Sequence, residues 1–73
     1  MGVDKIICKM KKQPNGIKFN EIAKVLNAYG YELVRSAGSH RQFRNERGEV
    51  ITIKEENPLK AVYIKDVLRR IGR

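Results

Sequence analysis

The sequence has one cysteine, one histidine, no tryptophan and only two prolines. The single cysteine, Cys8, excludes an internal disulfide, and with one histidine there is no cysteine- or histidine-rich metal site. No segment approaches the roughly 18 apolar residues that a membrane-spanning helix needs. Lysines interrupt the apolar run that begins at Ile6, so no signal-peptide core is present. We therefore expect a cytoplasmic protein without a metal, a cofactor or a membrane partner.

Acidic residues are also scarce relative to basic ones. There are 16 lysines and arginines against 8 acidic residues, which gives a net charge of +8. Such an excess favours nucleic acid, an acidic protein or an anionic membrane as partner. Every arginine lies at Arg35 or beyond, and guanidinium groups match phosphate geometry, so the second half is the better candidate for anion contacts. The alternative is a basic surface that only maintains solubility.

The 73 residues are enough for one small domain, 1–73. Apolar residues at helical spacing predict a helix over about 4–13 and a second helix that begins near Asn20 as its N-cap. Gly30 is placed to end this second helix. A last helix is expected over 62–71.

Between the second and last helices the apolar period shortens to two. This pattern predicts three strands, at 31–35, 40–44 and 49–53, joined as an antiparallel meander. The resulting order of two helices, three strands and a helix predicts an α+β fold with the helices on one face of the sheet.

Strand alternation predicts which side chains face the helices. Phe43, Ile51 and Ile53 form the inward set, and the burial of each contributes about 1.5–3 kcal/mol, which fixes the register. Arg41 shares the side of Phe43, so its charged head must reach solvent at a strand end or through the twist. The outward set is His40, Gln42 and Arg44.

His40 is the candidate for proton transfer, because the unperturbed imidazole pKa lies near 6.5. RNA cleavage needs a base for the ribose 2′-hydroxyl, cations to stabilise the phosphorane and an acid for the leaving oxygen. His40 can serve as the base or the acid. The candidate phosphate-binding cations are Arg35, Arg41, Arg44, Lys54 and Lys60. From the residues alone, an incidental histidine is the more common alternative.

Gly38 and Ser39 immediately precede His40. A glycine-containing turn lets the backbone approach a ligand closely and can direct amides at phosphate, so both residues are candidates for RNA binding. An ordinary hairpin turn is the alternative.

These residues together resemble the HicA family of toxins from bacterial and archaeal toxin–antitoxin pairs. The resemblance runs from Phe19 to Gly72, about three quarters of the chain. Its motifs are Tyr29-Gly30-Tyr31, Leu33-Val34-Arg35, Gly38-Ser39-His40 followed by Phe43, Val50-Ile51-Thr52-Ile53, and Val67-Leu68 in the last helix.

The resemblance implies a fold like the double-stranded-RNA-binding domain over 19–73, with 1–18 as an additional N-terminal helical extension. It also implies a metal-independent endoribonuclease that cleaves mRNA, inhibits translation and growth, and uses His40 as catalytic histidine. A HicB antitoxin that covers the active site in a hetero-oligomer is the implied protein partner.

The chain departs from the family pattern in two places. Many relatives carry a proline and often further histidines after the third strand, where this chain has Lys54-Glu55-Glu56. If cleavage needs a second proton carrier, Lys54 or Lys60 would have to assist. The N-terminal helix is outside the minimal pattern and is expected to pack on the core, contact the antitoxin or mediate self-association. A non-catalytic RNA-binding module and a protein-interaction subunit remain the alternative functions.

Overall fold

The computed structural model describes residues 2–73. In chain order the elements are α1 (Val3–Lys12), the 3-10 turn η1 (Pro14–Gly16), α2 (Phe19–Ala28), β1 (Glu32–Ala37), β2 (His40–Arg44), β3 (Val50–Lys54) and α3 (Ala61–Arg70). The strands form one antiparallel sheet in the order β1-β2-β3. The predicted α+β fold is therefore confirmed, including the additional N-terminal helix.

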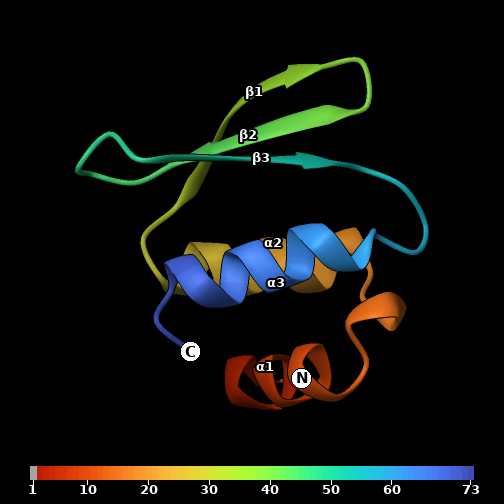
Figure 1. Cartoon of the computed structure of the whole chain (residues 1–73). Coiled ribbons are helices and arrows are strands. Elements are labelled where there is room, and N and C mark those ends of the chain that lie inside the picture. Colours follow the sequence, from red (N-terminus) through yellow and green to blue (C-terminus); the bar gives the residue numbers. More distant parts are fainter. Residues whose placement is uncertain (1) are drawn as a thin grey trace.

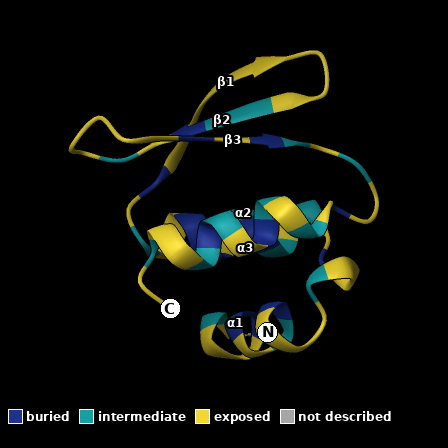
Figure 2. Ribbon diagram, viewed as in Figure 1, coloured by how far each residue is buried: buried dark blue, intermediate teal, exposed yellow. Residues whose placement is uncertain are grey.

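The elements form three layers (Figure 1). Helices α2 and α3 both lie under one face of the sheet and contribute to the same core cluster, and α1 lies below these two helices, on the side away from the sheet. Buried residues occupy the sheet–helix space and also the space between the helix pair and α1 (Figure 2). The opposite face of the sheet carries no buried side chain.

Helix α1 belongs to the core because its apolar face is completely covered. Ile6, Ile7 and Met10 are at most 2% exposed. Across the same contact, Lys9 Nζ lies 3.0 Å from Glu21 Oε2 of α2. Of the three roles expected for the N-terminal helix, packing on the core is the one observed.

The predicted start of α2 is wrong, whereas its predicted end is confirmed. The predicted N-cap at Asn20 is wrong, because the helix already begins at Phe19 with Lys18 as N-cap. Glu21 Oε1 accepts a hydrogen bond of 3.0 Å from the Lys18 backbone N–H, so a carboxylate inside the first turn caps the helix. At the other end Gly30 has φ +86°, as the prediction required, and turns the chain toward β1.

The strands agree with the predicted alternation, but four of their six limits differ. β2 has the predicted bounds, whereas β1 begins one residue and ends two residues later than predicted, and β3 is shifted by one residue at each end. The predicted four-residue connection between the first two strands is wrong, because Gly38 and Ser39 alone make the turn. Phe43, Ile51 and Ile53 are at most 2% exposed, which confirms the inward set.

Candidate nucleic-acid interface

The face of the sheet that α2 and α3 leave uncovered is the candidate interface, called the open face below. Cross-strand pairing arranges its side chains in three rows, because directly opposed residues of an antiparallel pair point to the same side. The rows are Ala37–His40–Lys54, Arg35–Gln42–Thr52 and Glu32–Arg44–Val50. Four of the predicted site residues, His40, Arg35, Arg44 and Lys54, therefore share one surface.

His40 is the first residue of β2 and is exposed. Lys54 lies directly opposite on β3, so the two Cβ atoms are roughly 5 Å apart. The Lys54 ammonium is partly engaged, at 3.9 Å from Glu56 Oε2, and the side chain remains 40% exposed. His40 and Lys54 are thus cross-strand neighbours whose side chains are both accessible on the open face.

Two guanidinium groups complete the positive charge of the open face. Within residues 2–73, the side chains of Arg35 and Arg44 form no hydrogen bond or ion pair. Gln42 and Thr52 lie in the same row as Arg35, and their side-chain polar groups are also without an intramolecular partner in the described chain. The open face therefore presents unengaged donors along the length of β2, as phosphate and base recognition would require.

Other predicted site residues lie elsewhere. Arg41 is on the helix side of β2, where its Nε lies 3.0 Å from Glu55 Oε1. Its Nη1 donates to the Gly38 carbonyl oxygen at 2.6 Å. Lys60 is the exposed N-cap of α3 and is not part of the sheet. The structure thus brings neither cation to the open face.

The turn before His40 is tightly defined. Gly38 has φ +59°, and no residue other than glycine among residues 2–73 has a positive φ. A Cβ at Gly38 would meet nothing within 4 Å, so the turn needs glycine for its backbone conformation rather than for space. The Glu55 backbone N–H donates to the Ser39 carbonyl at 2.6 Å, which ties the turn to the chain after β3.

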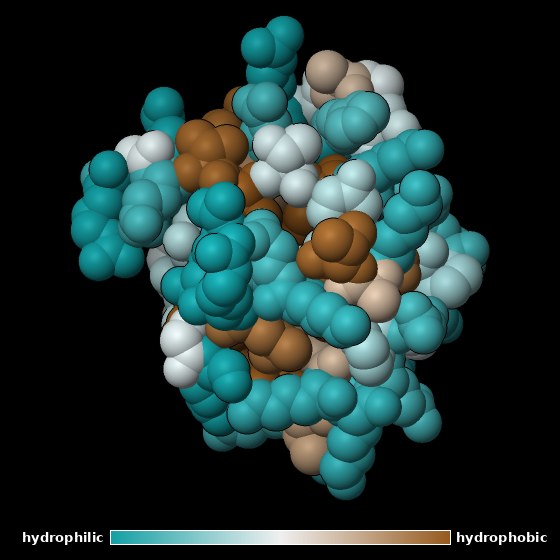
Figure 3. Space-filling view, in the orientation of Figure 1, coloured by the Kyte–Doolittle hydropathy of each residue, from teal (hydrophilic) through white to brown (hydrophobic). Residues whose placement is uncertain are grey.

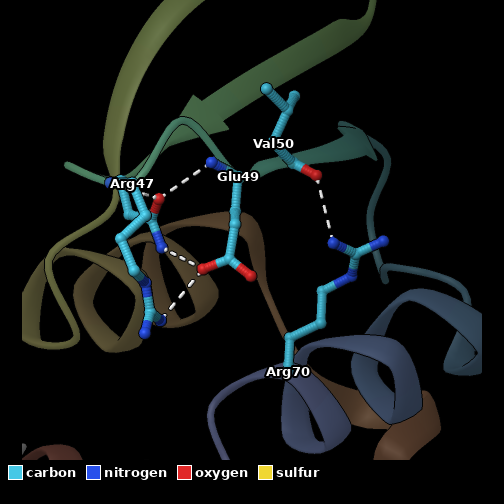
Figure 4. A network of polar contacts seen from close by, with 5 residues as sticks. Arg47, Glu49, Val50 and Arg70 are labelled. Atoms are coloured by element: carbon cyan, nitrogen blue, oxygen red, sulfur yellow. Dashed lines mark hydrogen bonds and ion pairs between the residues drawn. The ribbon is translucent and has the colours of Figure 1, made fainter.

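The far end of β2 is held by a separate polar network (Figure 4). Glu49 Oε1 accepts a hydrogen bond of 2.8 Å from Asn45 and lies 2.9 Å from Arg47 Nη2. The Asn45 bond, followed by the Arg47 charge, lowers the pKa of Glu49. From α3, Arg70 Nη1 donates to the Val50 carbonyl oxygen at 3.2 Å. These arginines stabilise the hairpin and the start of β3, so their charges are already engaged.

A hollow of about 490 Å³ adjoins this end of the sheet, with Glu32, Val34 and Arg44 in its wall. Arg44 is four positions after His40 in β2, which is about 13 Å along the strand. The hollow and the only imidazole of the chain therefore lie at opposite ends of β2.

The remaining surface offers few other sites. The side of the molecule in Figure 3 is largely hydrophilic, with small separate hydrophobic patches. Across residues 2–73, no three histidine, cysteine or acidic side chains are grouped as a metal site would require. None of the helices described has the length and apolar character to cross a membrane.

Two contacts at the site had no signal in the sequence pattern. The Arg41–Glu55 and Arg70–Val50 contacts join residues far apart in the chain, and neither lies at a helical or strand spacing. The inward direction of Arg41 predicted that its charged head reaches solvent and gave no indication of Glu55 as its partner.

The comparisons with known proteins agree with the resemblance in the sequence. A family model described as the HicA toxin of bacterial toxin-antitoxin matches residues 19–72. Neither the curated proteins nor the solved structures include a significant match. The matched segment spans α2, the whole sheet and α3, and so contains every residue of the open face. A toxin of this family implies an antitoxin as its partner. Because the match covers most of the chain, the protein belongs to the HicA family of toxins from toxin–antitoxin systems.

Proposed function

We propose that this toxin is a metal-independent endoribonuclease that cleaves mRNA and thereby inhibits translation and growth. The observation that carries the proposal is the first row of the open face, where His40 is exposed beside Lys54. Unengaged Arg35 and Arg44 lie on the same surface. The cytoplasm is the compartment in which the protein would meet mRNA.

In this mechanism the chain supplies proton transfer and positive charge. His40 removes the proton from the ribose 2′-hydroxyl, whose oxygen attacks the adjacent phosphorus, or it donates a proton to the departing 5′-oxygen. The Lys54 ammonium stabilises the additional negative charge of the phosphorane. Arg35 and Arg44 hold neighbouring phosphates, and the Gly38–Ser39 turn allows the backbone to approach the RNA.

The proposed inhibitor is an antitoxin of the HicB type that covers the open face in a hetero-oligomer. The net charge of +8 suits an acidic partner. Co-expression with such an antitoxin should restore growth, and the purified pair should lack nuclease activity.

The test of catalysis compares wild type, His40→Ala and the surface control Lys11→Ala. We expect induced wild type and Lys11→Ala to arrest growth and degrade mRNA, whereas His40→Ala does neither. The purified wild-type protein should cleave transcripts in EDTA. Equal toxicity and equal mRNA loss with His40→Ala would overturn the catalytic assignment.

A non-catalytic RNA-binding module is the second candidate. It is favoured by the presence of only one imidazole, so that no second histidine can complete an acid–base pair. This candidate predicts salt-sensitive RNA binding without cleavage. Purified protein that binds a transcript and leaves it intact in EDTA and in magnesium would select this function.

A further inference from the structure

Arg41 contacts the backbone of the turn that precedes His40. Its Nη1 donates to the Gly38 carbonyl oxygen at 2.6 Å and lies 3.3 Å from the His40 carbonyl oxygen. Its Nε is 3.0 Å from Glu55 Oε1. One guanidinium group therefore bridges the turn before His40 and the segment that follows β3.

Glu55 binds the same turn a second time through its backbone. Its N–H donates to the Ser39 carbonyl oxygen at 2.6 Å. The Glu55 side chain thus orients Arg41, and the Glu55 backbone holds Ser39 directly. Because Arg41 is paired with the buried Ile53, its side chain lies on the helix side of β2, and its contacts do not occupy the open face.

The turn needs such support because it lies at the end of the sheet. All residues from Glu32 to His40 are exposed, so apolar packing contributes little to holding this hairpin end. Hydrogen bonds and ion pairs are the remaining means of fixing His40. A displacement of about 1 Å in a reacting group can reduce the rate by about 100-fold.

We propose that Arg41 and Glu55 form a positioning clamp that holds the Gly38–Ser39 turn and so places the His40 imidazole for proton transfer. The inference rests on the proposed ribonuclease function. Arg41 then acts through His40 as a positioning residue and is not a phosphate ligand, although its charge and its place in the sequence both favoured RNA contact.

Substitution of Glu55 distinguishes an RNA-binding role of Arg41 from a positioning role, because the two roles predict different changes in the cleavage rate. If Arg41 binds RNA, Glu55→Gln removes a competing carboxylate, so RNA binding tightens and cleavage does not fall. If Arg41 belongs to the clamp, Glu55→Gln retains the backbone bond to Ser39 but loosens Arg41. We then expect the cleavage rate constant to fall about tenfold, with the affinity for 2′-O-methyl RNA, which cannot be cleaved, changed by less than about threefold.

The double variant tests whether the two side chains act as one unit. Arg41→Ala and Glu55→Ala should each slow cleavage, and the combination should be no slower than the more impaired single variant. Arg69→Ala, at an exposed arginine paired with Asp66 on α3, and Glu46→Gln, at the exposed turn between β2 and β3, are charge controls away from His40, and we expect wild-type cleavage from both. Circular dichroism at the assay temperature confirms that each variant is folded.

A second measurement does not depend on catalysis. Amide ¹⁵N relaxation of Ser39 and His40 should show increased mobility in Glu55→Gln and unchanged values in Glu46→Gln. Wild-type cleavage together with wild-type relaxation in Glu55→Gln would overturn the clamp. If wild type does not cleave RNA at all, the ribonuclease proposal fails, and the relaxation data alone decide whether the clamp orders the turn.

Discussion

Substitution of Met10 by alanine tests whether α1 is an integral part of the domain. Met10 is 0% exposed and lies in α1, in the same core cluster as Ile22 of α2 and Ile64 of α3. Loss of a buried methionine side chain costs about 2–5 kcal/mol. At roughly 0.05–0.15 kcal/mol per residue, a domain of this length has only about 4–11 kcal/mol of total stability. The substitution should therefore remove about half of it.

The expected consequence is a Tm lowered by about 8–40 °C, because a small domain loses roughly 4–8 °C for each kcal/mol. Thermal unfolding can be followed by far-ultraviolet circular dichroism and by tyrosine fluorescence. Tyr31 is 3% exposed and reports on the core beside the sheet. The two transitions should coincide in wild type and in Met10→Ala, because one core connects all three layers.

The control is Lys11→Ala, an exposed position on the same helix. Its free energy of unfolding should differ from wild type by less than about 0.5 kcal/mol. The reasoning is refuted if Met10→Ala leaves the fluorescence transition unchanged and only adds an early loss of helical signal. In that case α1 unfolds as an independent attachment.

Two further predictions concern ionic contacts. The Lys18 backbone N–H and, after it, Lys9 lower the pKa of Glu21 below its ordinary value of 4.5. The ionised Glu21 therefore stabilises the fold above that value, and this contribution is lost as the pH falls through the lowered pKa. Urea unfolding from neutral pH to about pH 3 should show this loss in wild type and a weaker dependence in Glu21→Gln; parallel curves would contradict the assignment. Lys54→Ala should weaken binding to 2′-O-methyl RNA and reduce the slope of log affinity against log salt by about 1; an unchanged slope would remove Lys54 from the interface.

The sequence predicted features that depend on local periodicity. Alternation along β2 was enough to direct Phe43 inward and His40 outward, because one buried aromatic residue fixes the direction of its neighbours. Positive φ at Gly30 followed from the same kind of local chemistry. These properties do not require knowledge of distant residues.

Features that depend on distant residues were not predictable in this way. The pairing of His40 with Lys54 follows from the register of β2 and β3, and the predicted connection between these strands was one residue too short. The reach of Arg41 to Glu55 depends on how β3 ends. The position of α1 below the other helices is a property of packing alone, since an amphipathic helix does not specify which surface covers it.

Helix α1 and the C-terminal segment lie on the side of the molecule away from the sheet (Figure 1). Arg73 Nη1 is 3.7 Å from Asp4 Oδ1, so the terminal segments are also close to one another. An affinity tag, a fluorophore or a surface tether attached at either end would therefore leave the His40 face accessible to a transcript. The same proximity favours circular permutation, in which a short linker joins the ends and the chain is opened at an exposed loop such as Glu46–Arg47.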